Sequence, residues 1–233
     1  WNHLFGVPGY LDLEFNTRYD SWNMATDGTA VLATRGEVWG SSPLGTTGKV
    51  HSPASPADVY ARLKVKFNEP ARRAGEALMA QDAVNPLVAP RKAWQYLPGQ
   101  RRVKMAPEIA YDTPNPGTAG SSTYDDVGIF NGAMDRFDFK LLGKQEMYIP
   151  YNTYKLNYEK EPSKFITANH LNPDYVRWEP HRVWVVEANL KPGKRHIYKK
   201  RIFYLDEDTS MTHVLESGTT TLGRHPDSVI VLD

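Results

Sequence analysis

The sequence predicts a mostly β protein built from antiparallel strands. Three observations support this: apolar runs of strand length, short connectors that contain Pro and Gly, and an aromatic content of 12%. The 17 Gly and 17 Pro residues supply frequent turns. With 233 residues and 40% hydrophobic content, the chain can bury a core without disulfides or a structural metal.

The first strand signal is RLKVKF at residues 62–67. It places Leu63, Val65 and Phe67 on one face and two lysines on the other, which is typical of a strand with one solvated face. Just before it, Ser55 followed by Pro56 resembles a helix start and predicts a short helix. Residues 71–80 contain good helix formers, but they include a glycine and are short, so we favour a strand there.

Two hairpins follow from their connectors. Residues 93–105 carry β-like runs on both sides of Pro98-Gly99, a pair that suits a type II turn. Residues 175–190 and 196–205 are rich in β-branched and aromatic side chains, and a Pro-Gly pair joins them. We therefore predict antiparallel pairing of Val183–Ala188 with Tyr198–Leu205 across a turn at Lys191–Lys194.

Two further features interrupt these strands. Pro180 has no N–H to donate, so it predicts a break in the ladder or an exposed edge. Residues 111–132 are crowded with Pro, Gly, Ser, Thr and Asp and predict a long loop.

Charge and composition exclude several classes of function. The net charge of +1 provides no field to attract nucleic acid, so we expect no nucleic-acid partner. The absence of Cys removes thiolate zinc sites and a Cys nucleophile. No phosphate-binding glycine loop or nucleophile elbow is present, and no two of the seven histidines fall at helical ligand spacing. We therefore expect no metal site, no cofactor and no enzymatic activity.

Aspartates offer the one candidate for catalysis. Asp125 and Asp126, with Asp135 and Asp138 downstream, could serve a carbohydrate-active β protein. Glycoside hydrolysis needs two carboxyl groups held about 5–10 Å apart on rigid elements. Adjacent residues in a glycine-rich loop suit this poorly, so we favour turn-forming and loop-capping roles.

Aromatic side chains supply the candidate ligand-binding residues. Positions two apart in a strand share a face, so Trp94 pairs with Tyr96 and Phe137 with Phe139. Such residues either fill a core or line an apolar cavity. The candidate set is Trp94, Tyr96, Phe137, Phe139, Trp184 and Phe203. Arg101 and Arg102, after the Pro98-Gly99 turn, form either a solvated hairpin end or a basic rim for an anionic headgroup.

Three long segments carry a resemblance to a known family. They are PRKAWQYLPGQRRVKMAPEIAYDTP, DDVGIFNGAMDRFDFKLLGKQEMYIPYN and NPDYVRWEPHRVWVVEANLKPGKRHIYKKRIFYLDED. Together with the opening WNHL, they resemble the bacterial family called domain of unknown function 1329 from about Trp1 to Asp208. The W-x-Y-L-P-x-x-R-R-V core at Trp94 to Val103 is also similar to the lipoprotein carriers LolA and LolB.

The resemblance implies a fold and an organisation. The fold would be a curved antiparallel sheet that forms an unclosed half-barrel with a few short helices, around an apolar cavity for acyl chains. Residues 1–208 would form a single carrier-like domain, a fragment of a longer family chain that begins with a secretory signal. Residues 209–233 depart from the family pattern and would form an atypical tail.

It also implies a function. We expect a carrier for a lipid, a lipoprotein or another hydrophobic molecule, in the periplasm or on the periplasmic face of the outer membrane of a Gram-negative bacterium. Its partners would be acyl chains and an envelope transporter, with peripheral membrane contact and a homodimer formed through open sheet edges. The alternatives are a structural or adaptor protein of the envelope and, less favoured, the carbohydrate-active protein.

Overall fold

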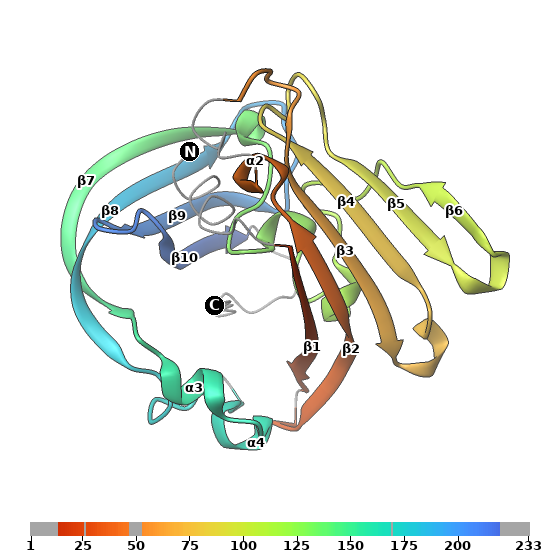
Figure 1. Cartoon of the computed structure of the whole chain (residues 1–233). Coiled ribbons are helices and arrows are strands. Elements are labelled where there is room, and N and C mark those ends of the chain that lie inside the picture. The colour runs from red at the N-terminus through yellow and green to blue at the C-terminus, as the bar shows by residue number, and fades with distance from the viewer. Residues whose placement is uncertain (1–13, 26, 47–52, 169, 220–233) are drawn as a thin grey trace. The chain divides into compact units, whose positions relative to one another are not determined.

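The computed structural model describes residues 14–25, 27–46, 53–168 and 170–219. It confirms a mostly β, antiparallel and unclosed fold with few, short helices. The chain forms two compact units, each with one open sheet (Figure 1). Within the described ranges, the first unit contains residues 14–22, 32–126 and 131–133, and the second contains the remainder. The expectation of one domain over residues 1–208 stays a prediction.

The first unit is built on a six-stranded sheet whose strand order follows the sequence. Its strands are β1 (Phe15–Met24), β2 (Ala30–Ser41), β3 (Val59–Glu69), β4 (Ala77–Ala83), β5 (Lys92–Leu97) and β6 (Arg102–Met105). A four-residue helix, α2 (Pro43–Thr46), follows β2. Consecutive antiparallel strands need only short links, which agrees with the many turn residues in the sequence.

The second unit is built on a four-stranded antiparallel sheet in the order β10, β9, β8, β7. Its strands are β7 (Phe137–Pro150), β8 (Trp178–Leu190), β9 (Tyr198–Asp206) and β10 (Thr212–Thr219). Two short helices, α3 (Tyr154–Tyr158) and α4 (Pro162–Phe165), lie in the connection from β7 to β8. Strand β10 lies within the segment expected to be an atypical tail, so residues 212–219 continue the sheet.

The predicted hairpin of β8 and β9 is confirmed. Val183 lies opposite Asp206 and Ala188 opposite Arg201, and the Lys194 N–H donates to the Lys191 carbonyl at 3.1 Å in the connecting turn. The prediction for Pro180 also holds. Pro180 pairs with β7 alone, because the pairing of β8 with β9 begins only at Val183.

The predicted hairpin of β5 and β6 is confirmed, but the predicted type II turn is wrong. Leu97 pairs with Arg102, so four residues form the loop. Pro98–Gln100 adopt a short 3-10 turn, and the positive φ of 49° falls on Arg101 rather than on Gly99. The Arg101 N–H closes this turn on the Leu97 carbonyl at 3.0 Å. Four-residue hairpin loops favour this arrangement over a type II turn.

The prediction of a short helix at residues 55–60 is also wrong. The Ser55 carbonyl accepts from the Asp58 N–H at 3.0 Å to form a single turn, and β3 begins at Val59. Tyrosine and valine at this point favour the strand over further helical turns. The strand preference for residues 71–80 holds for its second half, where β4 begins, while Ala71–Arg73 form a 3-10 turn.

Residues 111–132 form the predicted long loop, with short 3-10 turns at Pro116–Thr118 and Tyr124–Asp126. The loop contributes to the core of the first unit, because Tyr124 packs with Ala93, Ala106 and Ile109. In the second unit, Ile149, Val183 and Val185 form a core cluster. The opening WNHL motif and residues 220–233 lie outside the described residues.

Candidate functional site

The six-stranded sheet has two unlike faces. Strand register places Ala93, Leu78 and Phe67 on one face, where residues from the segment after β6 cover Ala93 and Leu78. We call this the Ala93 face. Ala93 and Phe67 are buried there. It is the face that supplies the core of the first unit.

The opposite face carries Trp94 and Tyr96, and we call it the Trp94 face. Direct cross-strand partners share a face, so the register defines two rows that cross the sheet from β2 to β6. One row consists of Trp39, Lys64, Met79, Trp94 and Met105. The neighbouring row consists of Glu37, Lys66, Ala77, Tyr96 and Val103.

Apolar area remains exposed on the Trp94 face. Val103 is 64% exposed and Met105 is 65% exposed, while Trp94 and Tyr96 are half-buried. Methionine and aromatic side chains adapt to apolar ligands of varied shape. This face therefore combines apolar contact area with solvent access.

Positive charge accompanies this apolar area. Lys64 and Lys66 are exposed within the rows, and the Lys64 ammonium lies 4.7 Å from the centre of the Trp39 ring. Arg101 and Arg102 are exposed at the turn that joins β5 to β6. The face could thus meet a molecule that has an apolar body and an anionic group.

The four-stranded sheet brings the other four candidate aromatics to one of its faces. Register places Phe139 opposite Ala188, and Val186 opposite Phe203. Phe137 and Trp184 share that face by alternation along β7 and β8. The two aromatic pairs therefore lie on different sheets: Trp94 and Tyr96 on the six-stranded sheet, and Phe137 and Phe139 on the four-stranded sheet.

These four side chains differ in burial. Phe137 and Phe203 are buried, and Phe130 packs edge-on to Phe203 with ring centres 5.4 Å apart. Phe139 is 39% exposed, next to the exposed Leu141. Trp184 is half-buried, and the Lys144 ammonium lies 4.2 Å from the centre of its ring. Phe137 and Phe203 thus act as core, while Phe139 reaches solvent.

The aspartates of the long loop make capping contacts. Asp125 and Asp126 are both buried. The Thr123 hydroxyl lies 2.6 Å from Asp125 Oδ1 and 2.8 Å from Asp126 Oδ2, and the Thr123 N–H donates to Asp126 at 2.9 Å. Carboxylates that fold back on their own loop in this way support the turn-forming and capping interpretation over the carbohydrate-active one.

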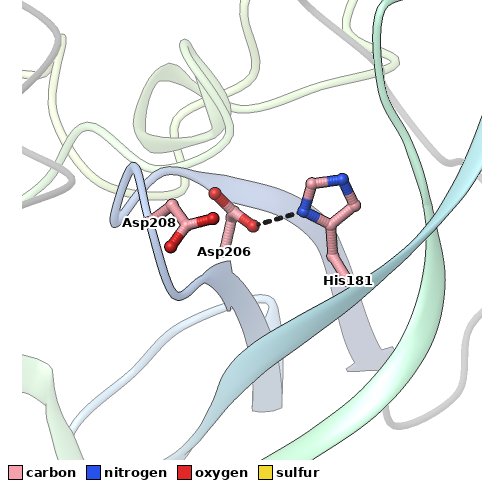
Figure 2. A group of neighbouring side chains, drawn as sticks. All are labelled: His181, Asp206 and Asp208. Carbon is pink, nitrogen blue, oxygen red and sulfur yellow. Dashed lines mark hydrogen bonds and ion pairs between the residues drawn. The ribbon is translucent and has the colours of Figure 1, made fainter.

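A second candidate site involves residues that sequence reasoning passed over. His181 on β8 lies beside Asp206 at the end of β9, with Asp208 in the turn that follows (Figure 2). One potential metal-ligand atom from each of the three lies within 4.8 Å of the others. His181 Nδ1 and Asp206 Oδ1 are 2.9 Å apart and form a hydrogen bond.

The environment keeps Asp206 charged. Its side chain is 1% exposed. Burial alone would raise the pKa of Asp206, but hydrogen bonds from the Thr209 N–H and hydroxyl and from His181 outweigh it and hold the pKa below its ordinary value. The ring of Tyr151 stacks on His181 with centres 4.2 Å apart. The site thus presents a fixed carboxylate and a fixed imidazole side by side.

Comparison with known proteins assigns the chain to a family. Residues 1–217 match the family described as "Protein of unknown function (DUF1329)". The chain belongs to the DUF1329 family. This confirms the resemblance drawn from the three long segments, and the match extends beyond Asp208 into β10.

The DUF1329 chain is similar to one curated relative and to two solved structures of low identity. An uncharacterized protein of Pseudomonas aeruginosa is 48% identical over 162 residues, which cover 69% of this chain and 36% of that protein. The chain thus spans about a third of that curated relative. A domain from Vibrio parahaemolyticus, provisionally named an outer membrane lipoprotein-sorting protein, has a TM-score of 0.51 at 14% identity, with 92% of this chain and 70% of that one covered.

A DUF1329 family protein from Desulfovibrio piger also has a TM-score of 0.51, at 13% identity, with 98% of this chain and 75% of that one covered. At these identities the two structures show a shared fold. They confirm the fold class of the DUF1329 chain and leave its ligand to be argued from its own residues.

The sequence did contain a signal for the His181 group. The predicted pairing of β8 with β9 brings the start of one strand to the end of the other, and His181 and Asp206 stand at those ends. Helical ligand spacing does not reveal this cluster, because it is assembled across a hairpin. Cross-strand positions at the open end of the predicted hairpin indicate it.

Proposed function

We propose that the DUF1329 chain belongs to a periplasmic, or outer-membrane-associated, carrier that binds a lipid, a lipoprotein or another hydrophobic molecule on the Trp94 face. The observation that carries the proposal is the row of aromatic and methionine side chains on the face opposite the core. A fold shared with a domain provisionally named a lipoprotein-sorting protein supports it. No helix among the described residues is long and apolar enough to cross a membrane.

Binding would work through burial of apolar surface. Removing apolar area from water contributes roughly 25 cal/mol per Å², or about 0.8 kcal/mol for each buried CH₂ group. An acyl chain laid along Trp94, Tyr96 and Met105 would gain several kcal/mol before the entropic costs of association are subtracted. Such binding needs no reaction chemistry, so the proposed carrier is not an enzyme.

The positive charges suit a molecule with an anionic headgroup. Lys64 and Lys66 lie within the rows, and Arg101 and Arg102 form the proposed basic rim at the hairpin end. Ammonium and guanidinium groups near an apolar surface attract phosphate or carboxylate groups. An envelope transporter would supply or accept the cargo.

In the second unit, Phe139 and Trp184 reach solvent while Phe137 and Phe203 are buried. We propose that Phe139 gives the four-stranded sheet an apolar contact surface of its own, apart from the Trp94 face, and that the two buried rings hold it in place. The candidate aromatics of the two sheets would then differ in role: contact at Trp94 and Tyr96, and support at the buried Phe137 and Phe203.

A second candidate function is that of an envelope adaptor that binds another protein. The observation in its favour is the four-residue strand β6, which ends the first sheet among the described strands and exposes Val103 and Met105. An exposed edge of this kind can pair with a strand of a partner or of a second copy, which would give a homodimer.

A fluorescent fatty acid titrated into the purified protein tests the carrier proposal. We expect saturable binding, which Trp94→Ala weakens by about 1–3 kcal/mol because a large contact surface is lost. Trp178→Ala is the matched control, since Trp178 is an exposed tryptophan on β8. Native mass spectrometry of protein purified from a Gram-negative periplasm would identify a co-purified lipid.

Thermal melting of the same variants separates the alternatives. If Trp94 mainly stabilises the fold, Trp94→Ala will lower the melting temperature strongly while the wild type binds no fatty acid. Equal loss of binding in Trp94→Ala and Trp178→Ala would also contradict a site on the Trp94 face.

A further inference from the structure

We propose that His181, Asp206 and Asp208 bind a divalent transition-metal ion, with Zn²⁺ as the best fit. The three side chains come from β8, from the end of β9 and from the following turn (Figure 2). Each offers one ligand atom, and these atoms lie within 4.8 Å of one another. One imidazole nitrogen with two carboxylate oxygens is a donor set that Zn²⁺ accepts.

The distance between the first two donors fits a shared metal. Zn²⁺ binds nitrogen and oxygen ligands at about 2.0–2.2 Å, so two neighbouring ligands of one tetrahedral ion stand about 3.3–3.6 Å apart. His181 Nδ1 and Asp206 Oδ1 are 2.9 Å apart. An ion could therefore replace the proton between them if the two side chains move apart by about half an ångström.

The surrounding contacts hold these two donors in place. The N–H and the hydroxyl of Thr209 donate to Asp206 Oδ2 at 3.0 and 2.9 Å, which leaves Oδ1 directed at His181. Tyr151 stacks on the imidazole and fixes the plane of its ring. Partners of this kind, which orient the ligands themselves, typically strengthen metal binding.

The other nitrogen of His181 also has a suitable neighbour. Glu179 Oε2 lies 3.8 Å from His181 Nε2, within ion-pair distance. When Nδ1 binds a metal, Nε2 carries the proton, and a small shift of the Glu179 side chain would bring its carboxylate within hydrogen-bond distance, as in carboxylate–histidine–zinc arrangements. The third ligand, Asp208, is exposed in the turn, so its side chain can adjust to complete the site.

The donor set also predicts selectivity. Ca²⁺ and Mg²⁺ prefer sites made entirely of oxygen, whereas imidazole favours Zn²⁺ and its neighbours in the first transition row. Three protein ligands leave at least one position for water or for a group of a bound molecule. The competing interpretation is a metal-free hydrogen bond from His181 to Asp206 that ties β8 to the end of β9.

Calorimetric titration of Zn²⁺ into the chelator-treated protein distinguishes the two. We expect one Zn²⁺ per chain, a higher melting temperature with Zn²⁺, and no competition from excess Mg²⁺ or Ca²⁺. Asp208→Asn should weaken binding at least tenfold while leaving the melting temperature of the metal-free protein unchanged, because Asp208 is exposed. His181→Gln should abolish stoichiometric binding.

Matched control variants show whether Zn²⁺ binds at other residues. Asp174→Asn and His170→Gln change exposed residues of the same types in the same unit and should leave the affinity unchanged. Bound Co²⁺ should give a visible absorption band that His181→Gln removes. Absence of stoichiometric Zn²⁺ uptake by the wild type, or equal affinity in the Asp208 and Asp174 variants, overturns the proposal.

Discussion

The two sheets of this chain distribute their apolar side chains differently. In the six-stranded sheet, RLKVKF alternates, so Leu63 and Val65 turn to the Ala93 face while the lysines turn to the Trp94 face. In the four-stranded sheet, the run VWVVEA on β8 is apolar on both faces. Val183 belongs to one cluster, and Ala188 is buried on the opposite side.

This difference decides which side chains stabilise the fold and which remain exposed for contact. A sheet with apolar side chains on both faces can bury some of them on each, so its two buried aromatics, Phe137 and Phe203, stabilise the fold. A sheet with one core face leaves the other free to carry residues that contact a ligand. The comparison therefore predicts that equivalent substitutions have unequal effects in the two sheets.

The largest expected effect is in the four-stranded sheet. Phe203 is 5% exposed and packs against Phe130, so Phe203→Ala should lower the free energy of unfolding by about 3–5 kcal/mol. Denaturant unfolding followed by circular dichroism measures it. A loss below about 1 kcal/mol would mean that this face is as open as the Trp94 face.

A smaller effect concerns a polar group of the first unit. Glu76 is buried and accepts hydrogen bonds from Arg73 at 2.8 Å and Gln95 at 2.7 Å. Burial works against the charge, but these bonds outweigh it and lower the pKa of Glu76. Glu76→Gln should cost about 1.5–3 kcal/mol at pH 7.

The pH dependence of that cost follows from the sign of the shift. A lowered folded-state pKa adds stability above the unfolded-state pKa of about 4.3, and this stability disappears as the pH falls through the folded value. Wild type and Glu76→Gln should therefore converge in stability as the pH falls from 5 towards 2. Unfolding at several pH values tests this, and a constant difference would contradict it.

A stabilising substitution is expected at the hairpin of β5 and β6. Arg101 has φ 49°, a left-handed conformation that glycine adopts without strain. Arg101→Gly should raise the free energy of unfolding by about 0.5–1 kcal/mol, and Arg102→Gly should not. If Arg101 belongs to the basic rim, Arg101→Gly should weaken the binding of an anionic fatty acid. The same variant should leave the binding of the corresponding neutral methyl ester unchanged.

The smallest effect is expected on the Trp94 face. Val103 is 64% exposed, so Val103→Thr, which keeps the β-branched shape, should change the free energy of unfolding by less than about 0.5 kcal/mol. A loss of several kcal/mol would show that Val103 is covered in the folded protein, and the contrast between the sheets would fail.

Local features of this fold could be predicted from the sequence, because they depend on neighbouring residues. Alternation in RLKVKF and the Pro-Gly connector after Leu190 predicted β3 and the hairpin of β8 with β9 correctly. The turn at Pro98 was misassigned, since turn type depends on loop length, which only the pairing of Leu97 with Arg102 reveals.

Features that depend on distant residues could not be predicted. The division of the strands between two sheets follows from long-range pairing. The sequence alone therefore could not assign Trp94 and Phe137 to different sheets. Alternation alone also cannot say which face of a strand is covered. The burial of Phe203 depends on Phe130, which is 73 residues away in the chain, and the His181 group depends on hairpin register.

The β-bulge in β7 has a consequence for aggregation. β7 has 14 residues and ends the second sheet among the strands that the structure describes. A long, regular strand at a sheet edge can add strands from other molecules and start a fibre. Here the register shifts between Leu141 and Gly143, and Gly143 has φ 124°, a value that only glycine adopts readily.

This interruption, flanked by the charged Lys140 and Lys144, breaks the row of backbone groups that an incoming strand would need to follow. The register shift at Gly143 would therefore also hinder the addition of strands from other copies of the chain to this edge.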